Sequence, residues 1–418
     1  GRLEQALKVE PSLAGVAAKL GKALLENNEG VKAISAFRRA VKIDAEDADI
    51  YNDLAAAYIR QGLATDAVST WQKALEIDPG HALVRSNLGV ALRDLGRLDE
   101  AIELYRTALE ANPDLPEAHA NLGIALREKG LIDQAIQSFD RAIALKPDNV
   151  NALYMHALVY DFKADDPNFA RLSAALQSAT LTTYHKILLN FALAKASDQT
   201  GRYDVAYQHL QRGNDGMATY AAYDSDAHRD EISSVISAFP TVRGATPEAQ
   251  AIAAKPIFVT GISRSGKTLI ESILSCNGDV FPALEHAGWT RAFNEKLYQN
   301  NLSKTFPACV SGLTSDDITD IGKSYWQEMK ALSNAARYVV NTSPGNYIYL
   351  SLILQALPSA KIIACRRDVL DNALFIYLSR YRRRHEYAYQ LNDIANYMQD
   401  YDRMMAHWIA LYGDQILQ

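Results

Sequence analysis

The chain has 418 residues, enough for two or three domains, and its 48% hydrophobic and 22% charged residues are typical of a globular protein. A net charge of −6 gives no support for nucleic-acid binding, and no run of about 18 apolar residues predicts a membrane span. The three cysteines, Cys276, Cys309 and Cys365, form no closely spaced pair, so they predict neither a disulfide framework nor a zinc site. They favour a reducing, cytoplasmic compartment.

A period of 34 residues runs through the first third of the chain. Four kinds of residue recur at this spacing: leucine at 54, 88 and 122, glycine at 62, 96 and 130, alanine at 67, 101 and 135, and an aromatic at 71, 105 and 139. A degenerate earlier unit contains Leu20, Ala33 and Phe37. The pattern resembles the tetratricopeptide repeat (TPR), in which two helices per unit cross at small residues and enclose an aromatic. We therefore expect an all-α TPR solenoid over residues 1–149, with residues 1–11 as the tail of another unit.

Such a solenoid presents a concave surface that often holds an extended peptide. We favour binding of a protein or peptide there over a pure scaffold or an oligomerisation surface. Asn87 and Asn121 occupy the same place in their units, and Asn52 is one residue out of register. These side chains are suited to bonding a peptide backbone, or they are simply solvated. The sequence does not indicate the oligomeric state.

After Asp148 the 34-residue period slips. Residues 188–214 predict one more helix pair, with a glycine turn at Gly201 and the packed aromatic at Tyr207. A divergent last unit of this kind would cap the solenoid. A helix at about 226–238 and a linker near Gly244 follow, so residues 150–245 are expected to form capping helices and a linker.

Residues 250–418 alternate short apolar runs with helical segments, which predicts an α/β domain with a parallel sheet. The expected strands span 257–260, 338–341 and 361–365, and the expected helices 347–357, 369–381 and 393–411. Polar residues follow each strand, at the sheet edge where open parallel sheets bind their ligands. Residues 415–418 predict the opening of one more strand, so we expect the domain, like the repeats, to extend beyond the sequence given.

The first of these strands leads into a glycine loop, residues 261–268, with the sequence Gly-Ile-Ser-Arg-Ser-Gly-Lys-Thr. Glycine turns that open a helix gather backbone N–H groups around a phosphate or sulfate. The loop matches the P-loop of nucleotide triphosphatases literally. It also resembles the R-S-G-T-T loop of sulfotransferases, which holds the 5′-phosphosulfate of 3′-phosphoadenosine 5′-phosphosulfate (PAPS). An ordinary glycine turn is the third reading, and the loop alone does not choose between them.

Further segments make the second resemblance specific. Residues 360–377, 387–391 and 405–408 look like parts of bacterial TPR-linked sulfotransferases, a family related to protein-tyrosine sulfotransferases, and residues 188–214 are similar to the repeat before the enzyme domain in that family. The resemblance implies a three-layer, P-loop-like domain that transfers a sulfuryl group from PAPS without a metal. It implies a hydroxyl or amine acceptor, and we slightly prefer a protein or peptide over a glycan or a small metabolite.

The resemblance also assigns residues to the donor. The residues expected to hold the 5′-phosphosulfate are Arg264, Ser265, Gly266, Lys267 and Thr268. Arg367 is expected to hold the 3′-phosphate, with Arg366 as its neighbour. The alternative interpretation of this arginine pair is a surface ion pair with Asp368 or Asp371.

On the acceptor side, Glu285 matches the glutamate that serves this family as general base, and Arg264 is expected at the reacting group. His286 is the competing base, since imidazole suits proton transfer at neutral pH. Trp289 and Tyr349 are candidate pocket walls or core residues. The basic run at 380–384 either meets an acidic acceptor segment or solvates a helix face.

Three positions depart from the family pattern. Ser263 stands where proline is usual, Lys267 where the first threonine is usual, and Phe375 where a serine bonds the 3′-phosphate. Two alternatives therefore stay open: a TPR scaffold with a degenerate, inactive sulfotransferase domain, and a P-loop enzyme that binds ATP or GTP.

Overall fold

A computed structural model of the chain describes residues 10, 12–220, 222–302, 305–333, 336–381 and 385–418. It divides into two compact units, residues 1–213 and 214–418. Most of the expected repeat tail at 1–11 and part of the basic run at 380–384 lie outside the described residues.

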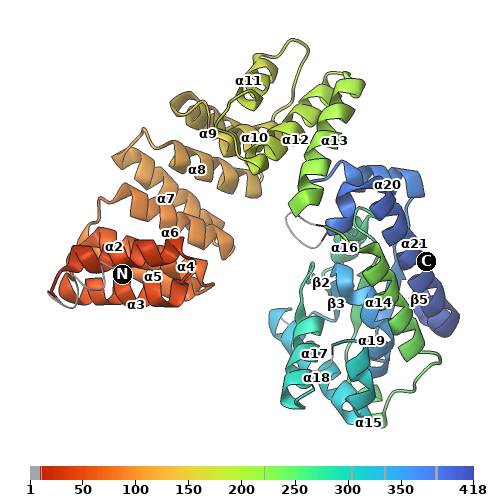
Figure 1. Cartoon of the computed structure of the whole chain (residues 1–418). Helices are drawn as coiled ribbons and strands as arrows, with labels where there is room; N and C mark the ends of the chain where they lie inside the picture. The colour runs from red at the N-terminus through yellow and green to blue at the C-terminus, as the bar shows by residue number, and fades with distance from the viewer. Residues whose placement is uncertain (1–9, 11, 221, 303–304, 334–335, 382–384) are drawn as a thin grey trace. The chain divides into compact units, whose positions relative to one another are not determined.

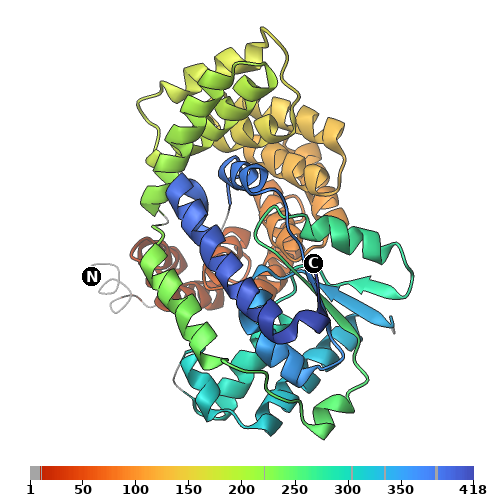
Figure 2. The ribbon, with the colours of Figure 1, turned by 90° about the vertical axis from the view of Figure 1, so that its right-hand side faces the viewer.

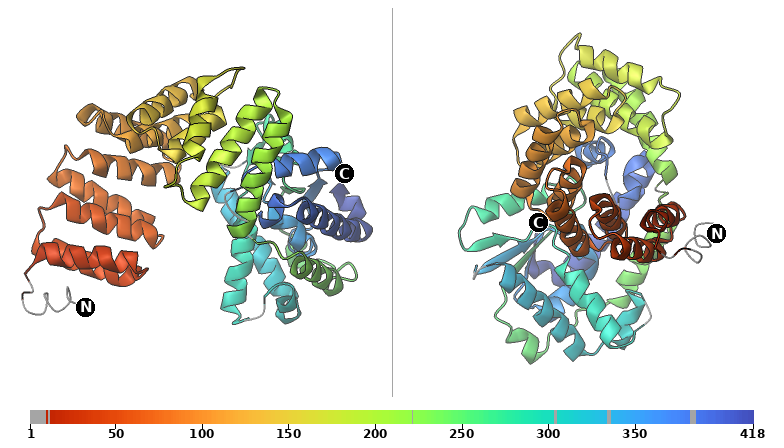
Figure 3. Two further views of the ribbon diagram at one scale, coloured as in Figure 1. Left: turned by 45° about the horizontal axis from the view of Figure 1, so that its top comes forward. Right: turned by 90° about the vertical axis from the view of Figure 1, so that its left-hand side faces the viewer.

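The N-terminal unit is a stack of helix pairs (Figures 1 and 3). From residue 14 to residue 159, helices that follow one another in the chain pack side by side, first within a pair and then against the next pair. Its helices are α2 (Ala14–Glu26), α3 (Gly30–Ile43), α4 (Ala48–Arg60), α5 (Ala64–Ile77), α6 (Ala82–Asp94), α7 (Leu98–Ala111), α8 (Pro116–Glu128), α9 (Ile132–Leu145), α10 (Val150–Val159), α11 (Pro167–Leu176), α12 (Thr183–Gln199) and the start of α13 (Tyr203–Tyr220). The described residues of this unit contain no strand, and the prediction of an all-α TPR solenoid is confirmed.

The aromatic column is the core of the repeats. It consists of four buried side chains, Phe37, Trp71, Tyr105 and Phe139. Each of the last two rings lies against a glycine of the preceding helix. A β-carbon at Gly89 would lie 2.7 Å from the Tyr105 ring, and one at Gly123 would lie 2.6 Å from the Phe139 ring. Glycine at these positions lets the paired helices approach closely enough to enclose the ring.

The last helix pair, α12 and α13, keeps the turn of the repeats but not the predicted aromatic. Tyr207 is 50% exposed, so its assignment as the packed aromatic is wrong. Phe139 follows its turn glycine, Gly130, by nine residues, and the residue at the same distance from Gly201 is Leu210. Leu210 is only 5% exposed and fills the core position. The repeat register therefore extends through α13 with a leucine in the aromatic column.

This register makes a prediction about stability. Leu210→Ala is expected to lower the free energy of unfolding by about 2–5 kcal/mol, because it removes a buried side chain and leaves a cavity. Tyr207→Ala is expected to change it by about 0.5 kcal/mol or less, as surface substitutions do. Urea unfolding followed by circular dichroism measures both, and equal losses in the two variants would contradict the register.

The C-terminal unit is built on a five-stranded parallel sheet. Its strands are β1 (Pro256–Thr260), β2 (Val280–Pro282), β3 (Tyr338–Asn341), β4 (Lys361–Ala364) and β5 (Ile416–Leu417), in the order β2-β3-β1-β4-β5. The three expected strands are confirmed, and β5 is the strand that the last residues predict. Strand β2 was not predicted; it has three residues and ends on a proline.

Helices pack around this sheet (Figure 2). They are α14 (Ser225–Ala238), α15 (Pro247–Gln250), α16 (Lys267–Ser275), α17 (Gly288–Gln299), α18 (Ser315–Leu332), α19 (Leu350–Ala356), α20 (Val369–Tyr377) and α21 (Leu391–Tyr412). The central strands β1 and β3 are buried along nearly their whole length, as a three-layer α/β domain requires. The helix expected at 347–357 is shorter than predicted, because a 3-10 turn, Pro344–Tyr349, precedes α19.

Candidate functional site

The glycine loop connects the end of β1 to the start of α16. A β-carbon at Gly261 would lie 2.3 Å from Ser265 Oγ and 3.0 Å from the Cys365 carbonyl oxygen, so only glycine allows the loop to close there. Gly266 has a φ of +101° and Arg264 a φ of +64°, which turn the chain sharply into the helix. The loop therefore gathers its backbone N–H groups at the positive end of α16, as anion-binding loops do.

Lys267 lies inside this loop rather than on its surface. Its side chain is buried, and its ammonium donates hydrogen bonds to the carbonyl oxygens of Gly261, at 3.0 Å, and Ile262, at 3.1 Å. Burial lowers the pKa of Lys267, while the nearby carboxylate of Glu285 opposes that shift. The ammonium is thus engaged by the loop's own backbone.

Hydrogen bonds connect the loop to α20 and to the segment that follows this helix. Asn372 Nδ2 donates to the carbonyl oxygen of Ser263 at 2.8 Å, and Ser263 Oγ donates to the Tyr381 hydroxyl at 3.0 Å. Arg264 Nε donates to Ser379 Oγ at 3.0 Å. Ser263, one of the departures from the family pattern, therefore supplies a bond to the neighbouring segment that a proline side chain would not.

Arg366 and Arg367 follow β4 at the same edge of the sheet. They line a cavity of about 200 Å³ together with Ile262 of the glycine loop. The Arg367 guanidinium lies 4.4 Å above the centre of the Phe375 ring, and its Nη2 atom is 3.8 Å from a carboxylate oxygen of Asp371. Phe375, one of the departures from the family pattern, thus supports Arg367 through a cation–π contact.

A larger cavity, of about 690 Å³, opens at the carboxyl ends of the strands. We call it the strand-end cavity. Its lining comes from four parts of the domain. They are the glycine loop (Gly261, Ile262 and Ser263), the turn after β3 (Ser343, Pro344, Gly345, Tyr347 and Ile348), the segment around α17 (Glu285, Ala287, Thr290, Arg291, Asn294 and Glu295) and four aromatic side chains from other segments (His228, His385, Tyr387 and Tyr397). Arg264 and Thr268 belong to the glycine loop but are not among the described lining residues. The Arg264 guanidinium instead bonds Ser379.

The structure separates the two candidate bases. Glu285 lines the strand-end cavity and lies close enough to Lys267 to influence its pKa. His286 Nδ1 accepts a hydrogen bond from the Gly288 backbone at 3.1 Å, which places the imidazole Nε2 atom 3.5 Å from a carboxylate oxygen of Glu328. His286 is engaged by these two groups and is not among the described lining residues of the cavity.

Two buried polar side chains, Asn341 and Glu271, hold the Glu285 segment in place. Asn341 is one of the expected polar residues at a strand end, whereas the sequence did not single out Glu271. Asn341, at the end of β3, donates from Nδ2 to the His286 carbonyl oxygen at 2.9 Å and accepts from Asn346 Nδ2 at 2.7 Å. Glu271 of α16 accepts from the Leu284 backbone N–H at 2.8 Å. Burial raises the pKa of Glu271. Both residues fix the backbone on either side of Glu285.

An aromatic wall, which sequence reasoning also missed, forms part of the cavity. The Tyr387 and Tyr397 rings stack with centres 3.7 Å apart and planes 1° apart, and His228 stacks on Tyr397 at 5.0 Å. Burial raises the pKa of Tyr387 and of Tyr397, so their hydroxyls stay protonated at neutral pH. The predicted wall residues Trp289 and Tyr349 are absent from the described lining, and the buried Trp289 ring packs on the protein core.

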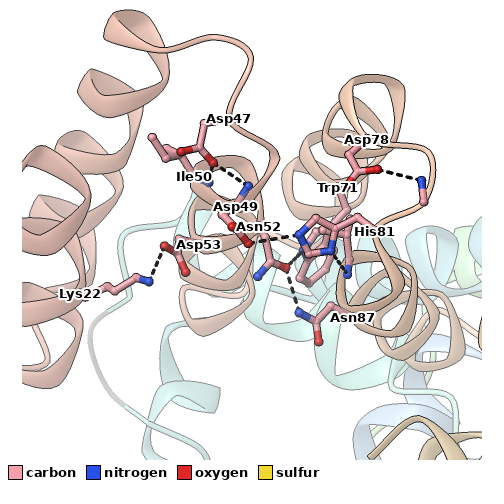
Figure 4. Close-up of polar contacts among 12 residues, drawn as sticks. Lys22, Asp47, Asp49, Ile50, Asn52, Asp53, Trp71, Asp78, His81 and Asn87 are labelled. Carbon is pink, nitrogen blue, oxygen red and sulfur yellow. Dashed lines mark hydrogen bonds and ion pairs between the residues drawn. The ribbon is translucent and has the colours of Figure 1, made fainter. Parts of the chain in front are cut away.

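In the repeats, two of the three candidate asparagines, Asn52 and Asn87, are hydrogen-bonded to each other (Figure 4). Asn52 is buried, and its side-chain oxygen accepts from Trp71 Nε1 and from Asn87 Nδ2, both at 2.9 Å. Asn52 therefore ties the aromatic of its own unit to the next unit. Asn87 is engaged by Asn52, so Asn121 is the remaining candidate for contact with a peptide.

Two absences concern only the residues that the structure describes. Among them, no group of three or more histidine, cysteine, aspartate or glutamate side chains is placed to hold a metal ion. None of the described helices combines the length and the apolar character that crossing a membrane requires.

Comparison with known proteins gives separate matches for the two parts of the chain. Residues 256–418 match a family model described as "Sulfotransferase family", and residues 1–48, 86–150 and 46–114 match models of the tetratricopeptide repeat. The chain therefore joins tetratricopeptide repeats to a sulfotransferase-family domain, as the sequence resemblance implies.

A curated relative and two solved structures illustrate these similarities. An uncharacterised protein of Aquifex aeolicus (strain VF5) is 27% identical over 278 residues, which cover 65% of this chain and 36% of the relative. YrrB, a TPR protein with an unusual peptide-binding site, is 20% identical with a TM-score of 0.35, covering 50% of this chain and 97% of YrrB. Pseudomonas aeruginosa PilF is 21% identical with a TM-score of 0.39, covering 47% of this chain and 88% of PilF.

Proposed function

We propose that the protein is a PAPS-dependent sulfotransferase that moves a sulfuryl group to a hydroxyl of a protein or peptide acceptor, or of a glycan. The observation that carries this proposal is the glycine loop, which opens onto a cavity lined by Glu285 and lies beside the arginines that follow β4. The sulfotransferase-family match over residues 256–418 supports it.

The donor side of the site uses cationic groups and backbone N–H donors, so it requires no metal. Arg264, Ser265, Gly266 and Thr268 hold the 5′-phosphosulfate. Ser265 Oγ is buried and has no hydrogen-bond partner among the described residues, so it is available to a bound anion. Arg367, with Arg366 beside it, holds the 3′-phosphate through charge-assisted bonds.

In the transfer step, the acceptor oxygen forms a bond to sulfur while the bond from sulfur to the donor's phosphate oxygen breaks. The acceptor's hydroxyl proton passes to the Glu285 carboxylate, which acts as the general base. The electron pair of the broken bond stays on the 5′-phosphate of the product, 3′-phosphoadenosine 5′-phosphate (PAP). The N–H groups of the glycine loop and the Arg264 guanidinium stabilise that developing charge.

The repeats of the N-terminal unit are suited to binding the acceptor. Tetratricopeptide repeats support interaction with another protein, and we propose that residues 1–149 hold part of a protein or peptide acceptor on their concave face. Residues 150–245 serve as capping helices and a linker, and residues 250–418 as the catalytic domain. The three free cysteines favour a reducing, cytoplasmic compartment.

Calorimetric titration with PAP, ATP and GTP tests this function and its alternatives. We expect PAP to bind more tightly than ATP or GTP, because the arginines after β4 recognise the 3′-phosphate. Tighter binding of ATP or GTP would favour the P-loop enzyme that the literal motif predicts. Failure of all three nucleotides to bind would favour an inactive domain on a TPR scaffold.

A further inference from the structure

The buried ammonium of Lys267 has an unusual position for an anion-binding loop. Lysine is almost never buried unless its charge is paired. Lys267 is 7% exposed, yet the acceptors of its hydrogen bonds are two backbone carbonyls, those of Gly261 and Ile262. The charged and titratable groups that influence the pKa of Lys267 are Glu285, Cys365 and Arg264. Its charge therefore lies among the loop's own peptide groups.

The direction of these two carbonyls fixes the direction of the next two N–H groups. In a trans peptide unit the C=O and the following N–H point in opposite directions within one plane. Because the carbonyls of Gly261 and Ile262 point to Lys267, the N–H groups of Ile262 and Ser263 point away from it. Both residues line the strand-end cavity.

The Ser263 backbone lies close enough to Tyr387 to influence the pKa of its hydroxyl. A hydrogen bond from the Ser263 backbone counteracts the rise that burial causes in the pKa of Tyr387, whose ring lines the same cavity. The buried Ser265 Oγ, without a partner among the described residues, is a second donor at the same loop.

We propose that Lys267 is a positioning residue that holds the glycine loop in its anion-binding shape, with its ammonium bonded to loop carbonyls rather than to the donor. Its hydrogen bonds turn two peptide groups so that their N–H bonds face the ligand, and its charge offsets the carbonyl dipoles behind them. The inference rests on the proposed role of the loop in holding the donor. It also explains how this chain accommodates a lysine where the sulfotransferase pattern has threonine.

Hydrogen exchange of the ligand-free protein tests the positioning role directly. Lys267→Met keeps the length of the side chain and removes the two hydrogen bonds, so amide exchange in a peptide covering residues 256–268 is expected to become faster. A lysine that only contacted the ligand would leave this exchange unchanged without ligand. Lys255→Met, at the amino end of β1, is the matched control and is expected to leave exchange in the glycine loop unchanged.

Nucleotide binding provides the second readout. Lys267→Met is expected to weaken binding by about tenfold or more, since it loosens several N–H donors at once. Lys267→Thr, which restores the family's residue, guards against a variant that does not fold. If folded Lys267→Thr protein showed unchanged loop exchange and wild-type affinity, the proposal would be overturned. If the wild type bound ATP in preference to PAP, the sulfotransferase proposal would fail while the exchange result still decided the role of Lys267.

Discussion

Arg367→Ala is expected to weaken binding of PAP by more than about tenfold, because the change removes a charge-assisted, bidentate partner of the 3′-phosphate. Arg367 lines the small cavity beside the glycine loop, where its guanidinium is supported by the Phe375 ring and lies near Asp371. Isothermal titration calorimetry of the purified protein with PAP measures the loss. The same titration with ATP, which lacks the 3′-phosphate, is expected to change little.

Two matched variants separate the 3′-phosphate contact from a general loss of positive charge. Arg366→Ala removes the neighbouring charge and is expected to cost less than Arg367→Ala. Phe375→Ser restores the family's hydroxyl, which is worth about 1.5–3 kcal/mol as a bond to phosphate, and loses a cation–π contact worth about 0.5–1 kcal/mol. The balance predicts tighter PAP binding. Unchanged affinity in both Arg367→Ala and Phe375→Ser would mean that the nucleotide binds elsewhere.

The repeats could be predicted because their information is periodic. Spacing of 34 residues identifies the aromatic column from Phe37 to Phe139 without any knowledge of the fold. In the divergent last pair the prediction chose Tyr207 because it was the nearest aromatic. The column position there is filled by an aliphatic side chain, Leu210. Spacing from the turn glycine was the better guide.

The site was predictable only where its chemistry is local in sequence. The glycine loop is one continuous motif, and its place after β1 is as expected. The aromatic wall is different, because His228, Tyr387 and Tyr397 come from separate segments that only folding brings together. No spacing rule links these positions.

The directions of individual side chains also could not be predicted from the sequence. The motif places Lys267 in the glycine loop but does not say whether its ammonium faces a ligand or the loop carbonyls. Similarly, Glu285 and His286 are adjacent in the chain, and only the structure directs one to the strand-end cavity and the other to Glu328.

Glu285→Gln is expected to lower sulfuryl transfer by about 10²–10⁴-fold while leaving PAP affinity nearly unchanged. A hydroxyl acceptor must lose its proton as the bond to sulfur forms, and a positioned carboxylate contributes a factor of this size. Glutamine keeps the shape of the side chain but cannot take the proton. Single-turnover sulfuryl transfer from PAPS to a hydroxyl-bearing peptide measures the rate, and calorimetry with PAP measures the affinity.

The cavity offers a close control for this change. Glu295 lines the same cavity from α17, so Glu295→Gln removes the same charge at another point of the wall. It is expected to affect acceptor affinity at most, with the transfer step preserved. His286→Ala is expected to cost less than Glu285→Gln, since the imidazole is held by Gly288 and Glu328. Full transfer by the Glu285→Gln protein, together with a large loss in His286→Ala, would reassign the base to His286 and would require the imidazole to leave Glu328 when the acceptor binds.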